Sequence, residues 1–563
     1  MNLFIPMNRE EVRQWRWSEL DIVLVTGDAY VDHPSFGAAV IGRFLISGGF
    51  RVGIISQPMK DEDFQVFGPP RLFFAVTGGN MDSMVCHYTS FKRLRHDDAY
   101  TPGNSAGSRP DYAVISYCQA LRRIYKGINL VIGGIEASLR RLAHYDFWSE
   151  RIKHSILLDA KADILVYGMG EYASLEIARC YDTGRDYRAV KGIAWVATRR
   201  EDLPQPPYHQ LIDYNSLQES PDRILEMTQN YLKWLNSDQP VLQASENRWV
   251  VINPSRPPLT TEELDAIYDL PYRYLPHPSY KKSISAFDMI QFSITISRGC
   301  PGGCSFCALN MHQGRIVQSR SIDSIAREIF QYRQQSDFKG IIKDLGAPTA
   351  NVYQLTYSRP EICSHCNRYS CLHPHHCPHF PFDNQPLIGL YRTVRALPGI
   401  RKAFVNSGIR WDLTDESYFE ELIRYHISGQ LKFAPEHVVD SVLDLMHKPP
   451  ADTLFEFIRE FERINRRFSL NQYLIPYFMS GFPGCRNQDM QAVVNFLRKW
   501  KFQPQQVQAF LPIPMTLATA MYVAEKEPNS GRPLYVAKKE SEKRDQRDSI
   551  LYLKQRKAYR SQP

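Results

Sequence analysis

The chain has 563 residues, which is too long for a single hydrophobic core, so two or three domains are expected. Its apolar content of 43% and charged content of 23% are those of a folded soluble protein, and the lack of any run of 18 apolar residues argues against a membrane span. The N-terminus becomes charged before an apolar segment develops, which argues against a secretory signal and predicts a cytoplasmic location.

The net charge is +8, and much of the excess lies near the C-terminus. Residues 537–563 contain nine Lys or Arg and four Asp or Glu, within a predicted basic C-terminal tail at 521–563. A basic tail can bind RNA phosphates. The alternative is a solvated helix of mixed charge.

Strand-like and helical segments alternate through the first 240 residues. The strand-like runs are continuous apolar segments, and most end in Gly or Ser, as strands do where they enter binding loops. Continuous apolar runs separated by helices indicate a parallel sheet that is covered on both faces. We therefore predict an N-terminal Rossmann-like α/β domain at 1–240, with strands at 21–26, 51–55, 72–76, 129–132 and 162–166.

A connector rich in Pro, Tyr and polar residues is predicted at 241–287, before a second β/α alternation begins. The strands of this second part are expected at 291–296, 340–343, 402–405, 430–434, 472–475 and 507–511, and its helices at 322–334, 416–426 and 489–500. Six β/α units suit a partial (β/α)6 barrel at 288–520. Chemistry in such barrels lies at the C-terminal mouths of the strands.

Cys300, Cys304 and Cys307 follow the first barrel strand at C-x3-C-x2-C spacing, with Gly and Pro between them. A loop of this kind can wrap one inorganic cluster, and thiolates are the usual protein ligands of iron–sulfur clusters. Three thiolates leave one iron of a [4Fe–4S] cluster open, which favours chemistry over scaffolding. The alternative is a zinc site of three thiolates that is completed by His312.

With Arg298-Gly299 ahead of the loop and Phe306 before its last cysteine, the chain resembles the radical S-adenosylmethionine (SAM) superfamily. The resemblance implies that the open iron binds the amino and carboxylate groups of SAM. One electron from the cluster then cleaves SAM to methionine and a 5′-deoxyadenosyl radical, which abstracts hydrogen from a substrate, while the protein orients and shields the cofactor. An electron donor such as flavodoxin or ferredoxin is also expected.

Further segments are similar to the YgiQ-type family of radical SAM proteins, and the similarity runs over nearly the whole chain. They are 27–37, 133–141, 343–351 and 433–437. The similarity implies an iron–sulfur/SAM enzyme with an extra N-terminal α/β region and no settled substrate. One departure is Phe482, which stands where the family pattern is expected to have His.

Residues that contact SAM are predicted from their positions alone. Asp344 follows the second barrel strand and is expected to face the SAM amino group, while Gly346 would allow close backbone approach. Ser407 and Arg410 follow the third strand, and the Arg410 guanidinium could pair with the SAM carboxylate. The alternative for each is a structural ion pair or cap.

Glu436 and His437 are the candidate catalytic residues, because they follow the fourth barrel strand. They could meet ribose hydroxyls or act in proton transfer. A structural ion pair or cap is the alternative for these two as well.

A second group of cysteines, Cys363, Cys366, Cys371 and Cys377, lies in a predicted insertion at 360–380 that also contains several His. The C-x2-C-x4-C-x5-C spacing could complete a tetrahedral zinc site or an auxiliary iron–sulfur cluster. A segment with so little apolar content could hardly fold without a metal. The alternative is free thiols beside solvent-exposed histidines.

No cofactor is predicted for the N-terminal domain. Cobalamin modules carry Asp, one spacer, His, two spacers and Gly, whereas Asp32 and His33 are adjacent here and Gly37 follows after three spacers. A GxGxxG nucleotide loop is also absent. The polar loops 28–35 and 136–141 are expected either to line a substrate or interdomain cleft or to cap helices.

The sequence therefore leaves two functions open. The first is a radical SAM enzyme that acts on a small molecule, a peptide or RNA. The second is an RNA-binding or regulatory protein whose cluster is structural or redox-sensing. Three cysteines favour the first function, because a structural cluster needs no open iron.

Overall fold

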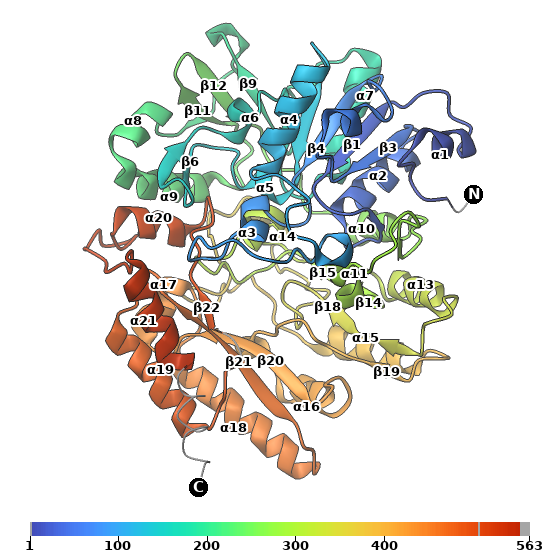
Figure 1. Cartoon of the computed structure of the whole chain (residues 1–563). Helices are drawn as coiled ribbons and strands as arrows, with labels where there is room; N and C mark the ends of the chain where they lie inside the picture. Colours follow the sequence, from blue (N-terminus) through green and yellow to red (C-terminus); the bar gives the residue numbers. More distant parts are fainter. Residues whose placement is uncertain (1–2, 505–506, 552–563) are drawn as a thin grey trace.

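A nine-stranded sheet forms the centre of the N-terminal half of the computed structural model, which describes residues 3–504 and 507–551 (Figure 1). The strand order is β10-β11-β12-β9-β8-β5-β4-β1-β3. In chain order the strands are β1 (Ile22–Thr26), β3 (Val52–Ser56), β4 (Phe73–Thr77), β5 (Leu130–Gly133), β8 (Ile164–Val166), β9 (Ile193–Ala197), β10 (His209–Gln210), β11 (Val241–Ser245) and β12 (Arg248–Ile252).

Five of these strands, in the order β3-β1-β4-β5-β8, form the predicted parallel sheet. Ile22 lies opposite Val52 on one side and Phe73 on the other, and every residue of β1 is buried. Burial on both faces explains why these strands read as continuous apolar runs. In a doubly wound sheet of this order, ligands bind beyond the carboxyl ends where the strand order reverses, here between β1 and β4.

Helices connect the strands of this half, and a short hairpin of β6 (His144–Asp146) and β7 (Arg151–Lys153) interrupts them. The helices are α1 (Arg9–Gln14), α2 (Gly37–Ser47), α3 (Ser83–His87), α4 (Ala113–Ile124), α5 (Gly134–Ser138), α6 (Ile156–Asp159), α7 (Glu171–Thr183), α8 (Tyr214–Glu219) and α9 (Ile224–Trp234).

The predicted connector at 241–287 is largely wrong, because much of it belongs to the N-terminal half. β11 and β12 form a hairpin that joins the sheet through β9 in antiparallel pairing. Its two-residue turn, Glu246-Asn247, lacks the glycine that usually marks such turns. Beyond it come α10 (Thr261–Tyr268), β13 (Leu275–Pro276), which pairs with β2 (Val31–Asp32), and α11 (Ser285–Ile290).

The C-terminal half contains strands in all six predicted regions and forms an open, partial barrel (Figure 1). Parallel pairs join β14 to β18, β17 to β19, and β20 to β21 and β22, while a bridge between Ile409 and Phe433 links the third region to the fourth. The strands are β14 (Ser293–Thr295), β17 (Ile341–Ile342), β18 (Asp344–Gly346), β19 (Lys402–Ala403), β20 (Gln430–Glu436), β21 (Tyr473–Ser480) and β22 (Val507–Ala509), and a small hairpin of β15 (Ser297–Arg298) and β16 (Gln318–Ser319) follows β14.

The predicted barrel helices are present as α13 (Ile322–Arg333), α16 (Glu416–Tyr425) and α19 (Asn487–Lys499). The other helices of this part are α12 (Leu309–Gln313), α14 (Pro360–Ser364), α15 (Gln385–Ala396), α17 (Asp440–Met446) and α18 (Ala451–Arg467). No helix within residues 3–504 and 507–551 is long and apolar enough to cross a membrane.

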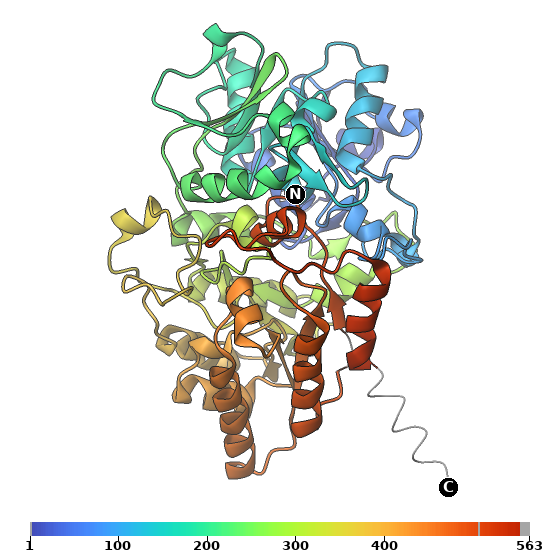
Figure 2. The same ribbon diagram turned by 90° about the vertical axis from the view of Figure 1, so that its left-hand side faces the viewer.

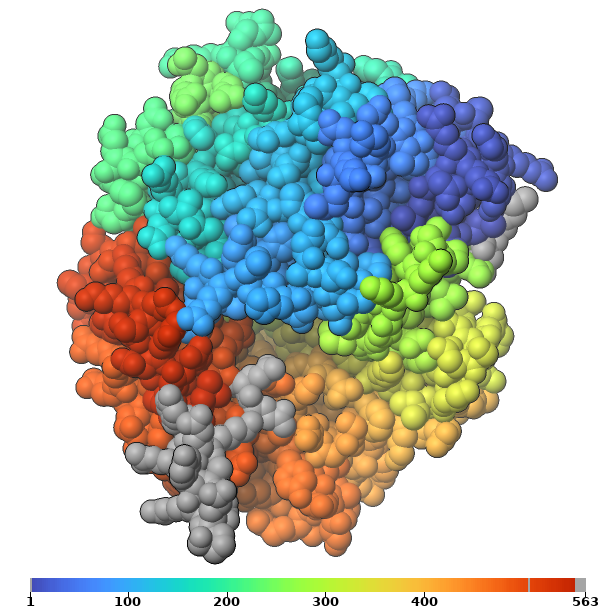
Figure 3. Space-filling view, viewed as in Figure 1, coloured from blue at the N-terminus to red at the C-terminus, as the bar shows by residue number. Residues whose placement is uncertain are grey.

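The predicted basic tail is part of the fold as far as residue 551, which corrects the sequence prediction; residues 552–563 lie outside the described part. α20 (Leu517–Ala524) packs on α9 of the N-terminal half, and α21 (Glu540–Leu551) packs on α19 (Figure 2). Figure 3 shows this C-terminal segment, in red, against the blue and cyan N-terminal half. Polar residues such as Lys543 and Gln546 are buried in these contacts.

Candidate active site

The loop that carries Cys300, Cys304 and Cys307 lies at the barrel mouth, after β14 and β15. Two glycines allow the loop to pack closely against neighbouring segments of the chain. Gly299 has φ +86°, and a Cβ there would lie 2.2 Å from the carbonyl oxygen of Ile316. Gly303 has φ +56°, and a Cβ there would lie 2.7 Å from a carbonyl oxygen of the Cys-rich insertion. No residue larger than glycine fits either position without a shift of the backbone.

Ser305, in the middle of the loop, is held by two separate parts of the chain. Its amide donates to the Met446 carbonyl at the end of α17, with an N–O distance of 3.1 Å. Its own carbonyl accepts from the amide of Ala518 in α20 at 2.9 Å. The conformation of the cysteine loop therefore depends on residues far along the chain.

Two polar side chains that the sequence reading missed lie beside the thiols. The Thr349 hydroxyl is 3.1 Å from the Cys300 sulfur. Tyr369 is partly buried, and its buried hydroxyl has no hydrogen-bond partner among the described residues. Burial raises the Tyr369 pKa, and the neighbouring Cys307, Cys304 and Cys300 raise it further. Neither residue has a sequence signal of its own, because the contacts arise from segments distant in sequence.

The three thiols fit a [4Fe–4S] cluster by donor type and surroundings. Burial raises the pKa of Cys300, and it raises that of Cys307 to about 12, so iron binding has to displace protons from these sulfurs. The Tyr369 hydroxyl supplies a hydrogen-bond donor that has no acceptor in the part of the chain that the structure describes. Within the described residues no three Cys, His, Asp or Glu side chains are arranged to hold a single metal ion, whereas the thiolates of a [4Fe–4S] cluster each bind a different iron.

The zinc alternative with His312 is not supported by the position of this ring. His312 is in α12, and its charged neighbours are Arg141, Glu171 and Arg298. Burial lowers its pKa to about 4, so the ring is neutral. It faces the seam between the two halves of the chain.

Arg410 is the predicted SAM-binding residue that lies nearest the thiols. Its Nη1 is 3.8 Å from the Cys304 sulfur. Its Nε and Nη2 donate to the two carboxylate oxygens of Asp412 at 2.9 and 2.8 Å. The Asn351 side chain accepts from the Arg410 amide at 2.9 Å and donates to its carbonyl, which holds the backbone in place. The Nε–Nη2 edge of the guanidinium group, which was expected to pair with the SAM carboxylate, is therefore already paired with Asp412. Nη1 is the guanidinium nitrogen that does not contact this carboxylate.

Asp344, Gly346 and Ser407 come together in one contact. The Asp344 carboxylate accepts from the amides of Asn406 and Ser407 at 2.8 and 3.1 Å and also from the Ser407 hydroxyl. A Cβ on Gly346 would lie 2.5 Å from Asp344 Oδ2 and 2.6 Å from Ser407 Oγ. The geometry therefore gives this trio a structural contact, which was the alternative, and SAM binding by these residues stays a prediction.

Glu436 is buried at the carboxyl end of β20, with φ +67°, a strained conformation for a residue other than glycine. Burial raises its pKa to about 7, although the charge of Lys448 lowers it. His437 is fully buried; its Nδ1 accepts from the Val439 amide and its Nε2 is 3.5 Å from the Cys485 sulfur. Of the two candidate catalytic residues, only Glu436 has a pKa near neutral pH.

Replacing Glu436 with Gln should remove a pH-dependent loss of stability. Below about pH 4.5 the Glu436 carboxyl group is protonated in both the folded and the unfolded chain. Between pH 4.5 and 7 it is ionised in the unfolded chain but remains largely protonated in the folded one. Folding stability therefore falls as pH rises, by about 3 kcal/mol once the folded pKa is passed. Urea unfolding at pH 5 and pH 8 measures this. Glu456→Gln, which removes an exposed carboxylate from α18, is the control, and an unchanged pH dependence in Glu436→Gln would contradict the burial argument.

Phe482, where the family pattern is expected to have His, forms an apolar wall near the cysteine loop. It is fully buried, and its ring lies edge-on to Phe306 with a centroid distance of 6.3 Å. No buried polar group is therefore introduced at this position.

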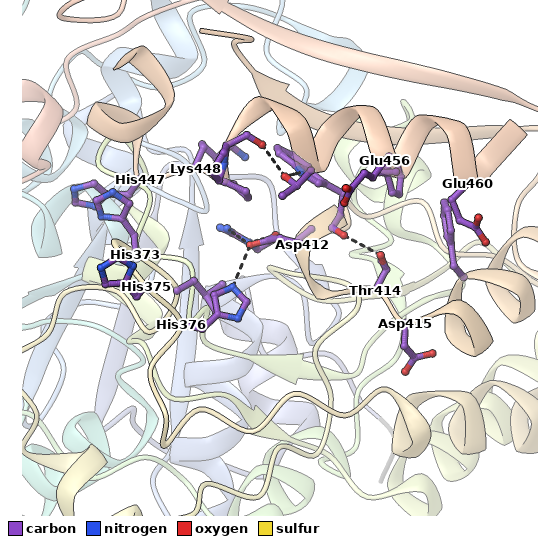
Figure 4. A pocket seen from close by; sticks show the side chains of 18 of the residues that line it. His373, His375, His376, Asp412, Thr414, Asp415, His447, Lys448, Glu456 and Glu460 are labelled. Carbon is purple, nitrogen blue, oxygen red and sulfur yellow. Dashed lines mark hydrogen bonds and ion pairs between the residues drawn. The ribbon is translucent and has the colours of Figure 1, made fainter. Parts of the chain in front are cut away.

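A cavity of about 700 Å³ lies beside the cysteine loop (Figure 4). Arg410 and Asp412 line it, so the cavity reaches the guanidinium that contacts Cys304. Figure 4 shows His373 and His447 at one end, where their rings stack at 4.2 Å, and acidic residues of α18 at the other. Its volume is in the range of small-molecule sites.

The carboxyl edge of the N-terminal sheet is filled by the chain's own charged side chains. Asp28 follows β1 and forms an ion pair with Arg109 at 2.9 Å; a Cβ on Gly79 would lie 2.2 Å from its Oδ1. Glu136 accepts from the amides of Ser83 and Val114 at 2.9 and 3.0 Å. Burial raises the Asp28 pKa to about 6. A ligand at this switch point would have to displace these groups.

The two halves are joined by a buried ion pair directly behind the cysteine loop. Arg298 Nη1 lies 2.7 Å from Glu171 Oε1, and both side chains are at least 96% buried. Arg298 also donates to the Tyr268 hydroxyl at 3.2 Å. Glu171 is the first residue of α7 in the N-terminal half. The ion pair thus fixes the base of the cysteine loop to the other half of the molecule.

Comparison with known families covers almost the entire described chain. A model described as "Radical SAM N-terminal" matches residues 4–293, and one described as "Radical SAM superfamily" matches residues 294–497. A UPF0313 protein of Bacteroides thetaiotaomicron is 44% identical, with coverage of 98% of this chain and 94% of that one. A UPF0313 protein of Geobacter sulfurreducens is also 44% identical, with coverage of 98% and 92%.

The fold also resembles a solved structure. The radical SAM methyltransferase TsrM from Kitasatospora setae, with cobalamin and a [4Fe–4S] cluster bound, has a TM-score of 0.51 and 15% identity, and the match covers 88% of this chain and 74% of TsrM. At this level of identity the likeness supports the fold alone.

Proposed function

The chain belongs to the UPF0313 family, the YgiQ-type family of radical SAM proteins, and on that basis we propose an enzyme that cleaves SAM reductively at a cluster bound by Cys300, Cys304 and Cys307. The observation that carries the proposal is the surroundings of these thiols. Three sulfurs lie at the barrel mouth, next to the Tyr369 hydroxyl, which has no partner among the described residues, and to Arg410 Nη1, which lies 3.8 Å from the Cys304 sulfur.

A [4Fe–4S] cluster held by Cys300, Cys304 and Cys307 would supply the electron for the reductive cleavage of SAM. The side chains around the thiols set the conditions for that chemistry. Arg410 places a positive charge 3.8 Å from the Cys304 sulfur, where it would offset the negative charge of a bound cluster. Tyr369 and Thr349 offer hydroxyl groups, and hydrogen bonds to cluster sulfurs tune the reduction potential.

Glu436 is the proposed proton acceptor. Its carboxyl group is buried near the same mouth and has a pKa raised to about 7, so it can exchange a proton near neutral pH. His437, whose pKa burial lowers to about 4, would serve as a neutral packing partner of Cys485. Asp344 and Ser407 would hold the loop that leads to Arg410.

The cavity beside Arg410 is the proposed route by which SAM or substrate reaches the thiols. Cationic and anionic side chains both line it, including Lys448 and Asp412. A route of this size admits a small molecule or an extended peptide segment. An RNA substrate has less support from the described residues, because the C-terminal helix α21 contains four acidic and three basic residues and packs on α19.

The proposal is tested with the full chain under anaerobic conditions. The cluster is reconstituted, SAM and a reductant (dithionite, or reduced flavodoxin or ferredoxin) are added, and 5′-deoxyadenosine is measured. We expect product formation and a change in the cluster's electron paramagnetic resonance spectrum on adding SAM. A reconstituted cluster that gives no product and no spectral change would overturn the proposal and favour the redox-sensing alternative.

A further inference from the structure

We propose that Cys363, Cys366, Cys371 and Cys377 bind a single zinc ion, separate from the cluster on the first three cysteines. The four cysteines line one small cavity of the Cys-rich insertion, together with Arg315, Tyr357, Arg368 and Phe380. The sequence left open whether such a site would hold zinc or iron–sulfur. The shape and contacts of the cavity favour one ion.

The first argument is size. The cavity has an accessible volume of about 10 Å³, which is close to the space of one water-sized sphere. A single tetrahedral ion on four thiolates fits such a space with small movements of the sulfurs. A cubane of eight iron and sulfide atoms needs several times that volume, and the insertion would have to open to admit it.

The second argument is the backbone around the sulfurs. The Arg368 amide donates to the Cys366 sulfur at 3.4 Å, two residues along the chain, and the Cys377 amide donates to the Cys371 carbonyl at 2.7 Å. These turns bring both halves of the motif to one cavity.

Two arginines supply positive charge at the same place. Arg315 donates through Nη1 to the Arg368 carbonyl and through Nη2 to the Cys363 carbonyl, both at 2.6 Å. The charges that act on Cys371 include Arg315 and the other three cysteines. Four thiolates on a zinc ion carry a net charge of −2, and these cations would offset it.

The third argument is that the insertion has almost no core of its own. Between residues 360 and 380 it has a single helical turn, α14, and only Ser370, Cys371, Leu372 and Phe380 are buried. Such a segment gains its folding free energy from metal binding. As it stands, no three candidate donor side chains in the described chain are arranged to hold a metal, so zinc would draw the four sulfurs inward.

The site has a consequence for the first group of cysteines, because the insertion docks on that loop. The Cys371 amide donates to the Pro301 carbonyl at 3.0 Å, and the Ser370 hydroxyl donates to the Gly302 carbonyl at 2.7 Å. Tyr369, the next residue, accepts at its carbonyl from the Asn310 amide group at 2.9 Å. A zinc ion would therefore fix the wall that carries the buried Tyr369 hydroxyl.

The test measures metal in a full-length variant that lacks the first thiols, Cys300→Ala/Cys304→Ala/Cys307→Ala. Elemental analysis after purification without added iron, and again after anaerobic incubation with iron and sulfide, should give one zinc and no iron per chain. Adding Cys371→Ser should abolish the zinc. Adding Cys180→Ser, a matched change of a buried cysteine in α7, should leave it in place.

Because Cys371→Ser could itself fail to fold, a second measurement uses the unmodified insertion. Cobalt(II) replaces zinc, and the visible absorption of a tetrahedral thiolate site should appear at one cobalt per chain. Limited proteolysis with and without a chelator should show cleavage within 360–380 only after metal removal. Iron with sulfide retained in the triple variant, or neither metal bound, would overturn the proposal. None of these readouts depends on SAM cleavage, so they stand or fall independently of the proposed enzyme.

Discussion

Replacing Cys304 with Ala is expected to lower reductive SAM cleavage to the background of the assay. Two thiolates cannot hold a [4Fe–4S] cluster in the site-specific form that leaves one iron open. The sulfur also lies 3.8 Å from Arg410 Nη1, so its loss leaves a buried guanidinium group beside a gap. We expect a loss of bound iron together with a loss of 5′-deoxyadenosine, both measured after anaerobic reconstitution.

The control for this change is Cys180→Ala, which removes a buried thiol from α7 in the N-terminal half. It should retain the iron content and the turnover of the parent protein. Undiminished 5′-deoxyadenosine formation by Cys304→Ala would remove this cysteine from the cluster and, with it, the assignment of the loop.

Replacing Glu171 with Gln should destabilise the chain by about 3–5 kcal/mol, because it leaves Arg298 as an uncompensated buried charge. Both side chains are at least 96% buried, at a distance of 2.7 Å. Arg298 lies two residues before Cys300, so the loss should also loosen the cysteine loop. Thermal and urea unfolding measure the stability, and iron content after reconstitution reports on the loop.

Glu176→Gln is the matched control, since Glu176 lies on the same helix and also pairs with an arginine. Its partner, Arg185, is 3.0 Å away, but the two side chains are 37% and 56% exposed. An exposed pair contributes about 0–1 kcal/mol, so little should change. Equal effects of the two substitutions would show that the interdomain ion pair does not hold the halves together.

The sequence predicted the strands well because their apolar runs are local signals. Each predicted strand of the N-terminal parallel sheet and of the barrel is present, and the cysteine loop follows the strand expected of it. The hairpin of β11 and β12 was not predicted, because its turn, Glu246-Asn247, lacks the glycine that usually marks a hairpin. The packing of the C-terminal segment was not predicted, because α21 buries polar residues such as Gln546. The hydropathy of such residues predicts that they are exposed to solvent.

Side-chain roles at the site were harder to predict, because they depend on partners distant in sequence. Position after a strand made Asp344 and Arg410 candidates but gave no sign that Ser407 and Asp412 occupy their polar edges. Tyr369 lies 69 residues from Cys300 in the chain and enters the site only through the docking of the insertion. Such contacts carry no periodicity, so only the folded chain reveals them.

The two hydrogen bonds of Ser305 bear on the order in which the protein is made. Met446 and Ala518 hold the cysteine loop, and a ribosome synthesises both long after the loop itself. Domains that emerge first fold first, so the N-terminal sheet can form while the rest is still being translated. The loop reaches its final shape only when α20 has emerged and packed on α9. Iron is therefore expected to enter a finished chain, and pulse-labelling in iron-starved cells should yield full-length protein that accepts the cluster after synthesis has stopped.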